Sequence, residues 1–105
     1  MRDFSVSDED KYALVAYGTK AMADLTDIRH SWLYEYQDGK AARELDALLA
    51  VLQAGLLALN GRDYLTALNG LRETIIRLRL MGRKEAADVL ADLENIYQHI
   101  TATRH

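Results

Sequence analysis

The sequence contains no cysteine and no proline, and only 8% of its 105 residues are aromatic. Without cysteine the chain forms no disulfide and offers no thiolate to a metal, so nothing in it indicates an oxidising compartment. Without proline, no residue removes the backbone N–H that an uninterrupted helix requires. Half of the composition is apolar, and most of that half is alanine and leucine, which are strong helix formers. These features favour long helices within a single domain.

The chain also has little net charge and no long hydrophobic run. Its formal charge of −3 argues against nonspecific binding of nucleic acid. The first residues are charged rather than apolar, so no secretory signal peptide is predicted. The longest apolar run, at 47–59, is 13 residues long, which is too short to span a bilayer. We therefore expect a cytoplasmic protein that contacts neither nucleic acid nor membrane.

Apolar spacing and turn residues predict helices over about 8–38, 40–59, 63–81 and 84–100. Ser7 is a suitable N-cap for the first helix because acidic residues follow it, and Asp63 is a suitable N-cap for the third. The pair Asn69-Gly70 lies inside the third helix, but the apolar stripe keeps its phase across the pair. We expect this helix to continue through it.

Loops of two to four residues make successive helices antiparallel. The predicted fold is therefore all-α, an antiparallel bundle of about four helices that forms one domain over 1–105. The first helix is unusually long, exceeding the others by about ten residues at the predicted boundaries. Residues 1–6 and 102–105 are expected to fray.

The apolar run at 47–59 has two faces on a helical wheel. Leucines form one face, and small residues, including Val51 and Ala54, lie nearly opposite, with Leu57 beside them. Small side chains let a second helix approach closely, which predicts a homodimer seam or another protein interface. The alternative is an exposed surface, because alanine is a good helix former in water.

Aromatic residues gather near the end of the first predicted helix. Trp32, Tyr34 and Tyr36 belong to the residue types that anchor protein interfaces, and they are candidate partner-binding residues. Trp32 and Tyr36 also continue the apolar stripe, so core packing is the alternative for both. His30 has no second histidine or cysteine at ligand spacing, and no metal site is predicted there.

Arginines recur along one face of the third predicted helix and its extension. Arg72, Arg79 and Arg83 lie beside Ile76 and Leu65 on this face. Such a row is suited to an acidic partner surface or a phosphate. The alternative is that these cations stabilise the C-terminus of the helix and pair with acidic residues of neighbouring helices.

Two acidic pairs at i,i+3 spacing, Asp24/Asp27 and Glu85/Asp88, could together hold Mg²⁺ if their helices face each other. The segment Glu85-Ala86-Ala87-Asp88 resembles the E-x-x-D element of all-α nucleotide pyrophosphohydrolases of the MazG type. The resemblance covers about ten residues and implies Mg²⁺-dependent nucleotide hydrolysis. That family also has an E-x-x-E pair on another helix, whereas this chain has the shorter-reaching Asp24 and Asp27.

The chain shows no catalytic, cofactor-binding or metal-binding motif of any strength, so we expect binding rather than catalysis. The predicted function is a small helical interaction module that regulates a larger partner, as inhibitors, anti-activators, adaptors and chaperones of bacteria or phages do. The alternatives are the Mg²⁺-dependent hydrolase and a structural subunit of an assembly. The predicted partner-binding residues are Trp32, Tyr34, Tyr36, Val51, Ala54, Leu57, Arg72 and Arg79.

Overall fold

The computed structural model describes residues 6–102, and all regular secondary structure in this range is helical. The predicted all-α class is therefore confirmed. The described chain is elongated, with extents of 48 × 22 × 21 Å. Its helices are α1 (Asp8–Tyr34), α2 (Gly39–Asn60), α3 (Tyr64–Leu80), α4 (Lys84–Val89) and α5 (Ala91–Ala102).

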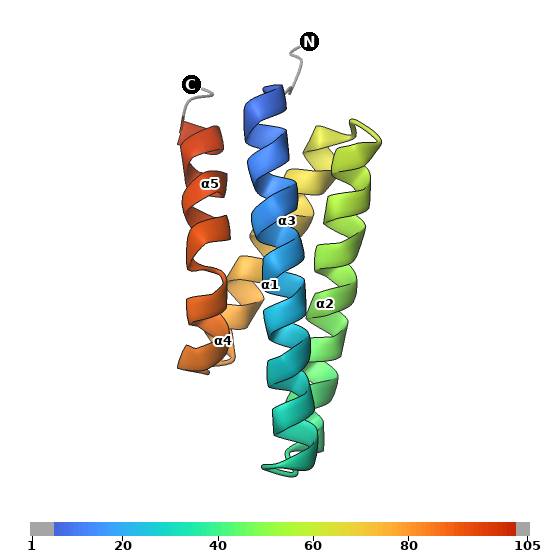
Figure 1. Cartoon of the computed structure of the whole chain (residues 1–105), viewed down its shortest axis with the longest axis vertical. Helices are drawn as coiled ribbons and strands as arrows, with labels where there is room; N and C mark the ends of the chain where they lie inside the picture. The colour runs from blue at the N-terminus through green and yellow to red at the C-terminus, as the bar shows by residue number, and fades with distance from the viewer. Residues whose placement is uncertain (1–5, 103–105) are drawn as a thin grey trace.

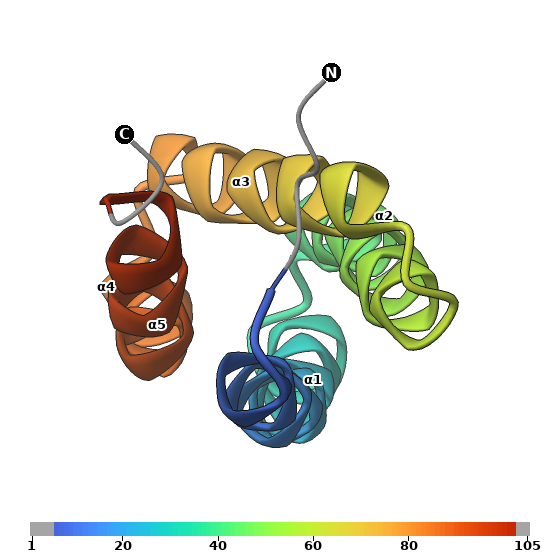
Figure 2. The same cartoon turned by 90° about the horizontal axis from the view of Figure 1, so that it is seen from above.

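The helices surround one apolar interior. In Figure 1, α1 lies between α2 on one side and the α4–α5 pair on the other, and it packs against all of them. Figure 2 shows α3 crossing from α2 toward α4, on the side opposite α1. Leucines from four of the helices fill the space between them, which accounts for the apolar stripes of the sequence. The fully buried leucines include Leu14, Leu25, Leu45, Leu48, Leu52, Leu59, Leu71, Leu78 and Leu93.

Side-chain caps fix where three helices begin. The Ser7 hydroxyl accepts the backbone N–H of Asp10 at 3.1 Å, and the Asp63 carboxylate accepts that of Thr66 at 3.3 Å. Both predicted N-caps are therefore confirmed. Asp38 caps α2 in the same way, by accepting the backbone N–H of a residue in its first turn. Each cap satisfies one of the N–H groups that a helix N-terminus leaves unpaired.

The predicted end of the first helix is wrong. The first helix ends at Tyr34, and its length of 27 residues exceeds the 22 of α2 by five rather than by about ten. Gln37 has a φ of +53°, and the N–H of Asp38 donates to the carbonyl of Trp32 at 2.8 Å. This turn places Tyr36 outside the helix. The predicted stripe therefore does not extend to Tyr36, whose side chain is exposed.

The last predicted helix is two helices, so the described chain has five rather than four. The break lies at Leu90, whose N–H donates to the carbonyl of Ala87 at 3.1 Å, three residues back instead of four. Leu90 is buried, and α5 continues beyond α4 along nearly the same line (Figure 1). No proline or glycine lies at this tightened turn, so no residue type marked the break. Asn69-Gly70 does not interrupt α3, as predicted.

Small residues do bring two helices close together, but both belong to this chain. A Cβ added to Gly70 of α3 would lie 3.5 Å from the Cα of Gly55 and 3.6 Å from the carbonyl oxygen of Val51, both in α2. The backbones of α2 and α3 therefore pack directly against each other. Ala54, on the small-residue face predicted to receive a helix, is exposed instead.

The two ends of the chain are only partly covered by the structure. Most of the residues expected to fray, 1–5 and 103–105, lie outside the described residues. Val6 belongs to the buried core, and Ala102 is the last residue of α5.

Among residues 6–102, no helix combines the length and hydropathy needed to cross a bilayer.

Candidate functional site

Trp32 lies in the core rather than on the surface. Its side chain is 1% exposed, and its indole N–H donates to the carboxylate of Glu85 at 3.1 Å. The guanidinium of Arg83 lies over the ring, 4.7 Å from its centroid, which is a cation–π contact. Trp32 therefore anchors the α3–α4 connection against α1 and presents no surface to a partner.

Asp38, Arg83 and Glu85 join Trp32 in a set of contacts that we call the clasp. Arg83 forms an ion pair with Asp38, whose other carboxylate oxygen caps α2. The backbone hydrogen bond at that cap, followed by Arg83, lowers the pKa of the Asp38 carboxyl. The pKa of Glu85 is lowered first by a hydrogen bond from its own backbone N–H and then by the indole of Trp32. Every charged group of the clasp thus has an internal partner.

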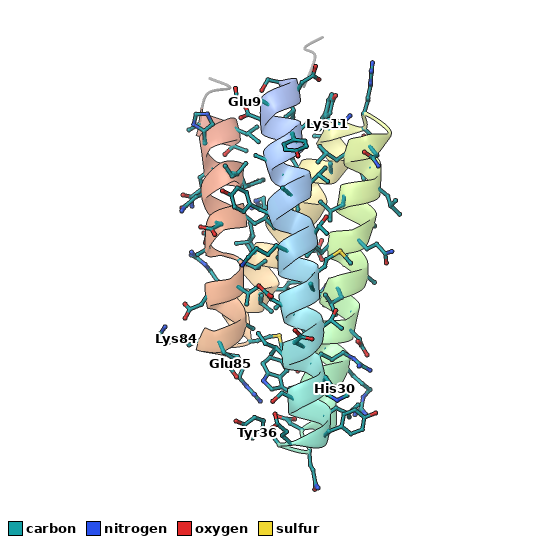
Figure 3. The ribbon with its side chains drawn as sticks, in the orientation of Figure 1. Glu9, Lys11, His30, Tyr36, Lys84 and Glu85 are labelled. Carbon is teal, nitrogen blue, oxygen red and sulfur yellow. The ribbon has the colours of Figure 1, made fainter. Side chains whose placement is uncertain are left out.

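Tyr34 and Tyr36 lie at the same end of the molecule as the clasp but on its outside. Figure 3 shows Tyr36 in the turn that follows α1, with His30 on the helix above it. The side chain of Tyr34 is 64% exposed, and its ring lies 4.5 Å from that of His30, centroid to centroid. The predicted aromatic cluster is therefore divided between a buried tryptophan and two exposed tyrosines.

The predicted surface of α2 is only partly open. Val51 is half-buried, whereas Ala54 is exposed and Leu57 is 64% exposed. The exposed part is an alanine-rich face with a single large apolar side chain. Val51, Ala54 and Leu57 lie on α2, whereas the predicted arginines Arg72 and Arg79 lie on α3.

Arg72 and Arg79 line a groove between α3 and α5, with a volume of about 200 Å³. Its floor is apolar: Ile75 is buried, Tyr97 is half-buried, and Ile76 is 41% exposed at the edge. We call it the α3–α5 groove. Its lining residues are Arg72, Ile75, Ile76, Arg79, Glu94, Tyr97 and Gln98.

The charges of the α3–α5 groove are only partly paired. Arg79 forms an ion pair with Glu94 across the groove at 2.5 Å, and Gln98 donates to the other oxygen of Glu94 at 3.3 Å. Arg72 forms no ion pair with any residue in 6–102, although it is exposed at the groove edge. The groove therefore combines an apolar floor with one arginine that has no counterion among residues 6–102.

No sequence pattern indicated that residues of α5 line the groove. Tyr97 is on the apolar stripe of the last predicted helix, which suggests core, and Glu94 has no spacing signal that links it to Arg79. The stripe keeps its phase across the break at Leu90, because Ala86 before it and Leu93 and Ile100 after it are all buried. Only the opposite charges of Arg79 and Glu94 indicated that the two residues form an ion pair.

Two other hollows lie elsewhere on the molecule. One, of about 320 Å³, lies beside the first turns of α1, where Figure 3 labels Lys11, and is lined by Asp8, Lys11, Tyr12, Val15 and Asn60. The other, of about 180 Å³, is lined by Glu44, Arg77, Leu80 and Met81. No residue of either lining belongs to the fully buried core, whereas the α3–α5 groove has Ile75 as its floor.

Three of the four carboxylates of the hydrolase alternative have separate partners. Asp24 pairs with Lys20 at 3.3 Å and Asp88 with Lys84 at 2.6 Å, whereas Glu85 belongs to the clasp. Across residues 6–102, no three or more histidine, aspartate or glutamate side chains gather where they would hold a metal ion. The described fold thus does not assemble the magnesium site that the resemblance to MazG-type enzymes implies.

Comparisons of the chain with protein-family models, with curated proteins and with solved structures found no match. The ten-residue resemblance to pyrophosphohydrolases therefore has no support from a wider similarity. A helical fold by itself implies no particular activity, so the surface of this chain is the remaining indication of its function.

Proposed function

We propose that this chain is a small helical interaction module that regulates a larger protein by occupying part of its surface through the α3–α5 groove. The observation that carries the proposal is the exposed Ile76, which lies between two arginines above a buried apolar floor. A half-exposed isoleucine gains free energy when a partner covers it. Arginine and aromatic residues such as Tyr97 are enriched where proteins bind each other.

The proposed mechanism requires only the burial of apolar surface and the attraction between opposite charges. Ile76 and Tyr97 would supply the apolar contact, and Arg72 at the edge would orient the partner by attracting opposite charge. An inhibitor, anti-activator, adaptor or chaperone acts in this way, by covering a surface that the partner uses elsewhere. The direction of the regulation then depends on the surface that is covered.

Co-purification from cells that produce the chain tests this proposal. Ile76→Glu should abolish the recovery of the partner, because it replaces the exposed apolar side chain that the partner would bury with a charge. Leu80→Glu is the matched control, since Leu80 is on the same helix, is 80% exposed and lies outside the α3–α5 groove. If both variants recover the partner equally, or both lose it, the groove is not the binding site.

We also propose that two copies associate through the exposed face of α2. The support is Leu57, a large apolar side chain that lies in water near Ala54 on that face. Leu57→Arg should shift the mass from a dimer to a monomer without lowering the helix content. Sedimentation equilibrium of the unmodified chain that gives 11.9 kDa at high concentration would contradict the dimer.

A further inference from the structure

We infer that the α3–α5 groove receives an amphipathic helix of the partner protein, with carboxylates beside its apolar face. This inference rests on the proposed function and names the chemistry of the partner. It follows from the length of the exposed face of α3 and from the balance of charges around the groove.

The exposed face of α3 is longer than the groove itself. Exposed side chains recur at Leu65, Asn69, Arg72, Ile76 and Arg79, every three or four residues, so they form one continuous strip. From Leu65 to Arg79 the strip is about 21 Å long at the rise of an α-helix. A small ligand would fill the hollow of about 200 Å³ and leave Leu65 in water. A partner helix of about four turns covers the whole strip, as in helix-in-groove recognition.

The charges along this strip select carboxylates. Arg79 is already paired with Glu94, and Arg77, on another face of α3, is paired with Glu73. Arg72 has no counterion within residues 6–102, so a carboxylate that approaches it breaks no ion pair of the fold. A guanidinium binds a carboxylate through two parallel hydrogen bonds, which fixes orientation as well as sign.

The exposed Ile76 and Arg72, which is unpaired among the described residues, together fix how a partner helix aligns along α3. Arg72 and Ile76 are four residues apart and therefore neighbours on the helix surface. The partner helix needs an apolar residue to cover Ile76 and an acidic residue about one turn away to reach Arg72. Glu94 repels carboxylates at the other edge, beside Arg79, so the acidic residues should lie mainly on the Arg72 side.

Three labelled peptides of about 15 residues, long enough to cover the strip, test the inference by fluorescence anisotropy. The first has leucines at helical spacing flanked by glutamates. The second replaces each glutamate with lysine, and the third scrambles the first so that its apolar period is lost. The first should bind about tenfold or more tightly than either of the others. A lysine peptide that binds as tightly as the glutamate peptide would overturn the inference.

Arg72→Glu should weaken binding of the glutamate peptide about tenfold or more, because it replaces an attraction with a repulsion. Arg77→Glu is the matched control and should change the affinity by less than about twofold, since Arg77 lies outside the groove. Circular dichroism establishes that both variants are folded, and Arg72→Gln replaces Arg72→Glu if the latter is not. Equal effects of the two charge reversals would overturn the inference.

Ile76→Glu separates failure of this inference from failure of the proposed function. If Ile76→Glu weakens binding of the lysine or the scrambled peptide while Arg72→Glu has no effect on any peptide, the acidic helix is wrong and the groove remains a protein-binding site. If no peptide responds to Ile76→Glu, both proposals fail. A labelled DNA duplex that binds more tightly than every peptide, and is released by Arg72→Glu, would also overturn the acidic helix.

Discussion

The clasp and the α3–α5 groove are built from the same residue types but differ in how those residues are satisfied. Each brings arginine, an aromatic ring and a carboxylate together from different helices or turns. In the clasp the ring of Trp32 is buried, and Arg83 has both an aromatic and an ionic partner. In the groove Ile76 is exposed and Arg72 has no ion-pair partner among residues 6–102. Burial and pairing, rather than residue type, therefore separate the contacts that hold this fold from those open to a partner.

The largest expected effect is that of Trp32→Ala in the clasp. Removing a fully buried aromatic side chain should lower the free energy of unfolding by about 3–5 kcal/mol. Urea denaturation followed by circular dichroism measures this change. Tyr34→Ala is the control on the same helix and should change stability by about 0.5 kcal/mol or less, because Tyr34 is exposed. Similar losses in both variants would mean that Trp32 is not the anchor of the clasp.

The next effect contrasts an arginine of the clasp with one of the groove. Arg83→Gln should destabilise the chain by about 1–2 kcal/mol, since it removes a cation–π contact and a charged hydrogen bond. Arg79→Gln should cost less than about 1 kcal/mol, because the Arg79 side chain is 63% exposed and surface ion pairs contribute little. Thermal unfolding of both variants tests the order, and a larger loss for Arg79→Gln would reverse the comparison.

The clasp should also make stability depend on acid. Its two carboxyls, those of Asp38 and Glu85, have folded pKa values below their ordinary values of 3.8 and 4.5. They therefore stabilise the fold above those values, and this contribution is lost as the pH falls through the lower folded pKa values. The double variant Asp38→Asn, Glu85→Gln should lose less stability than the unmodified chain between pH 6 and pH 3, because it lacks the two carboxyls whose charged forms stabilise the fold. Parallel pH profiles of urea midpoints would contradict this role of the clasp.

The smallest effect on stability is expected in the groove. Arg72→Ala should change the free energy of unfolding by about 0.5 kcal/mol or less, because Arg72 is exposed and has no ion pair to lose among the described residues. Urea denaturation under the conditions used for Trp32→Ala measures it. A loss above about 1 kcal/mol would show that Arg72 supports the fold, and the contrast between groove and clasp would then disappear.

Local signals in the sequence were enough for most of the fold. Ser7 and Asp63 begin helices because their side chains accept backbone N–H groups, and this chemistry is visible in the residue types alone. The apolar residues of α3 keep their helical spacing across Asn69-Gly70, and this spacing is also visible in the sequence. The break at Leu90 was not predicted because no proline or glycine marks it.

The candidate site was predictable only along one helix. Spacing alone places Arg72, Ile76 and Arg79 on one face of α3, and the structure puts all three at the groove. Tyr97 faces them across the interface with α5, a register that no single-helix pattern contains. The indole of Trp32 likewise donates to Glu85, 53 residues away in the sequence, so a role in an interface and a role in the core were indistinguishable in the sequence.

Backbone and indole NMR spectra recorded during a titration with the glutamate peptide compare the two regions in a single measurement. The amide signals of Arg72, Ile76 and Gln98 should shift as the peptide fills the α3–α5 groove. The indole signal of Trp32, the only tryptophan of the chain, should stay unchanged because the clasp is closed within the fold. Shifts at the Trp32 indole with no change at Ile76 would contradict the assignment of binding to the groove and of stability to the clasp.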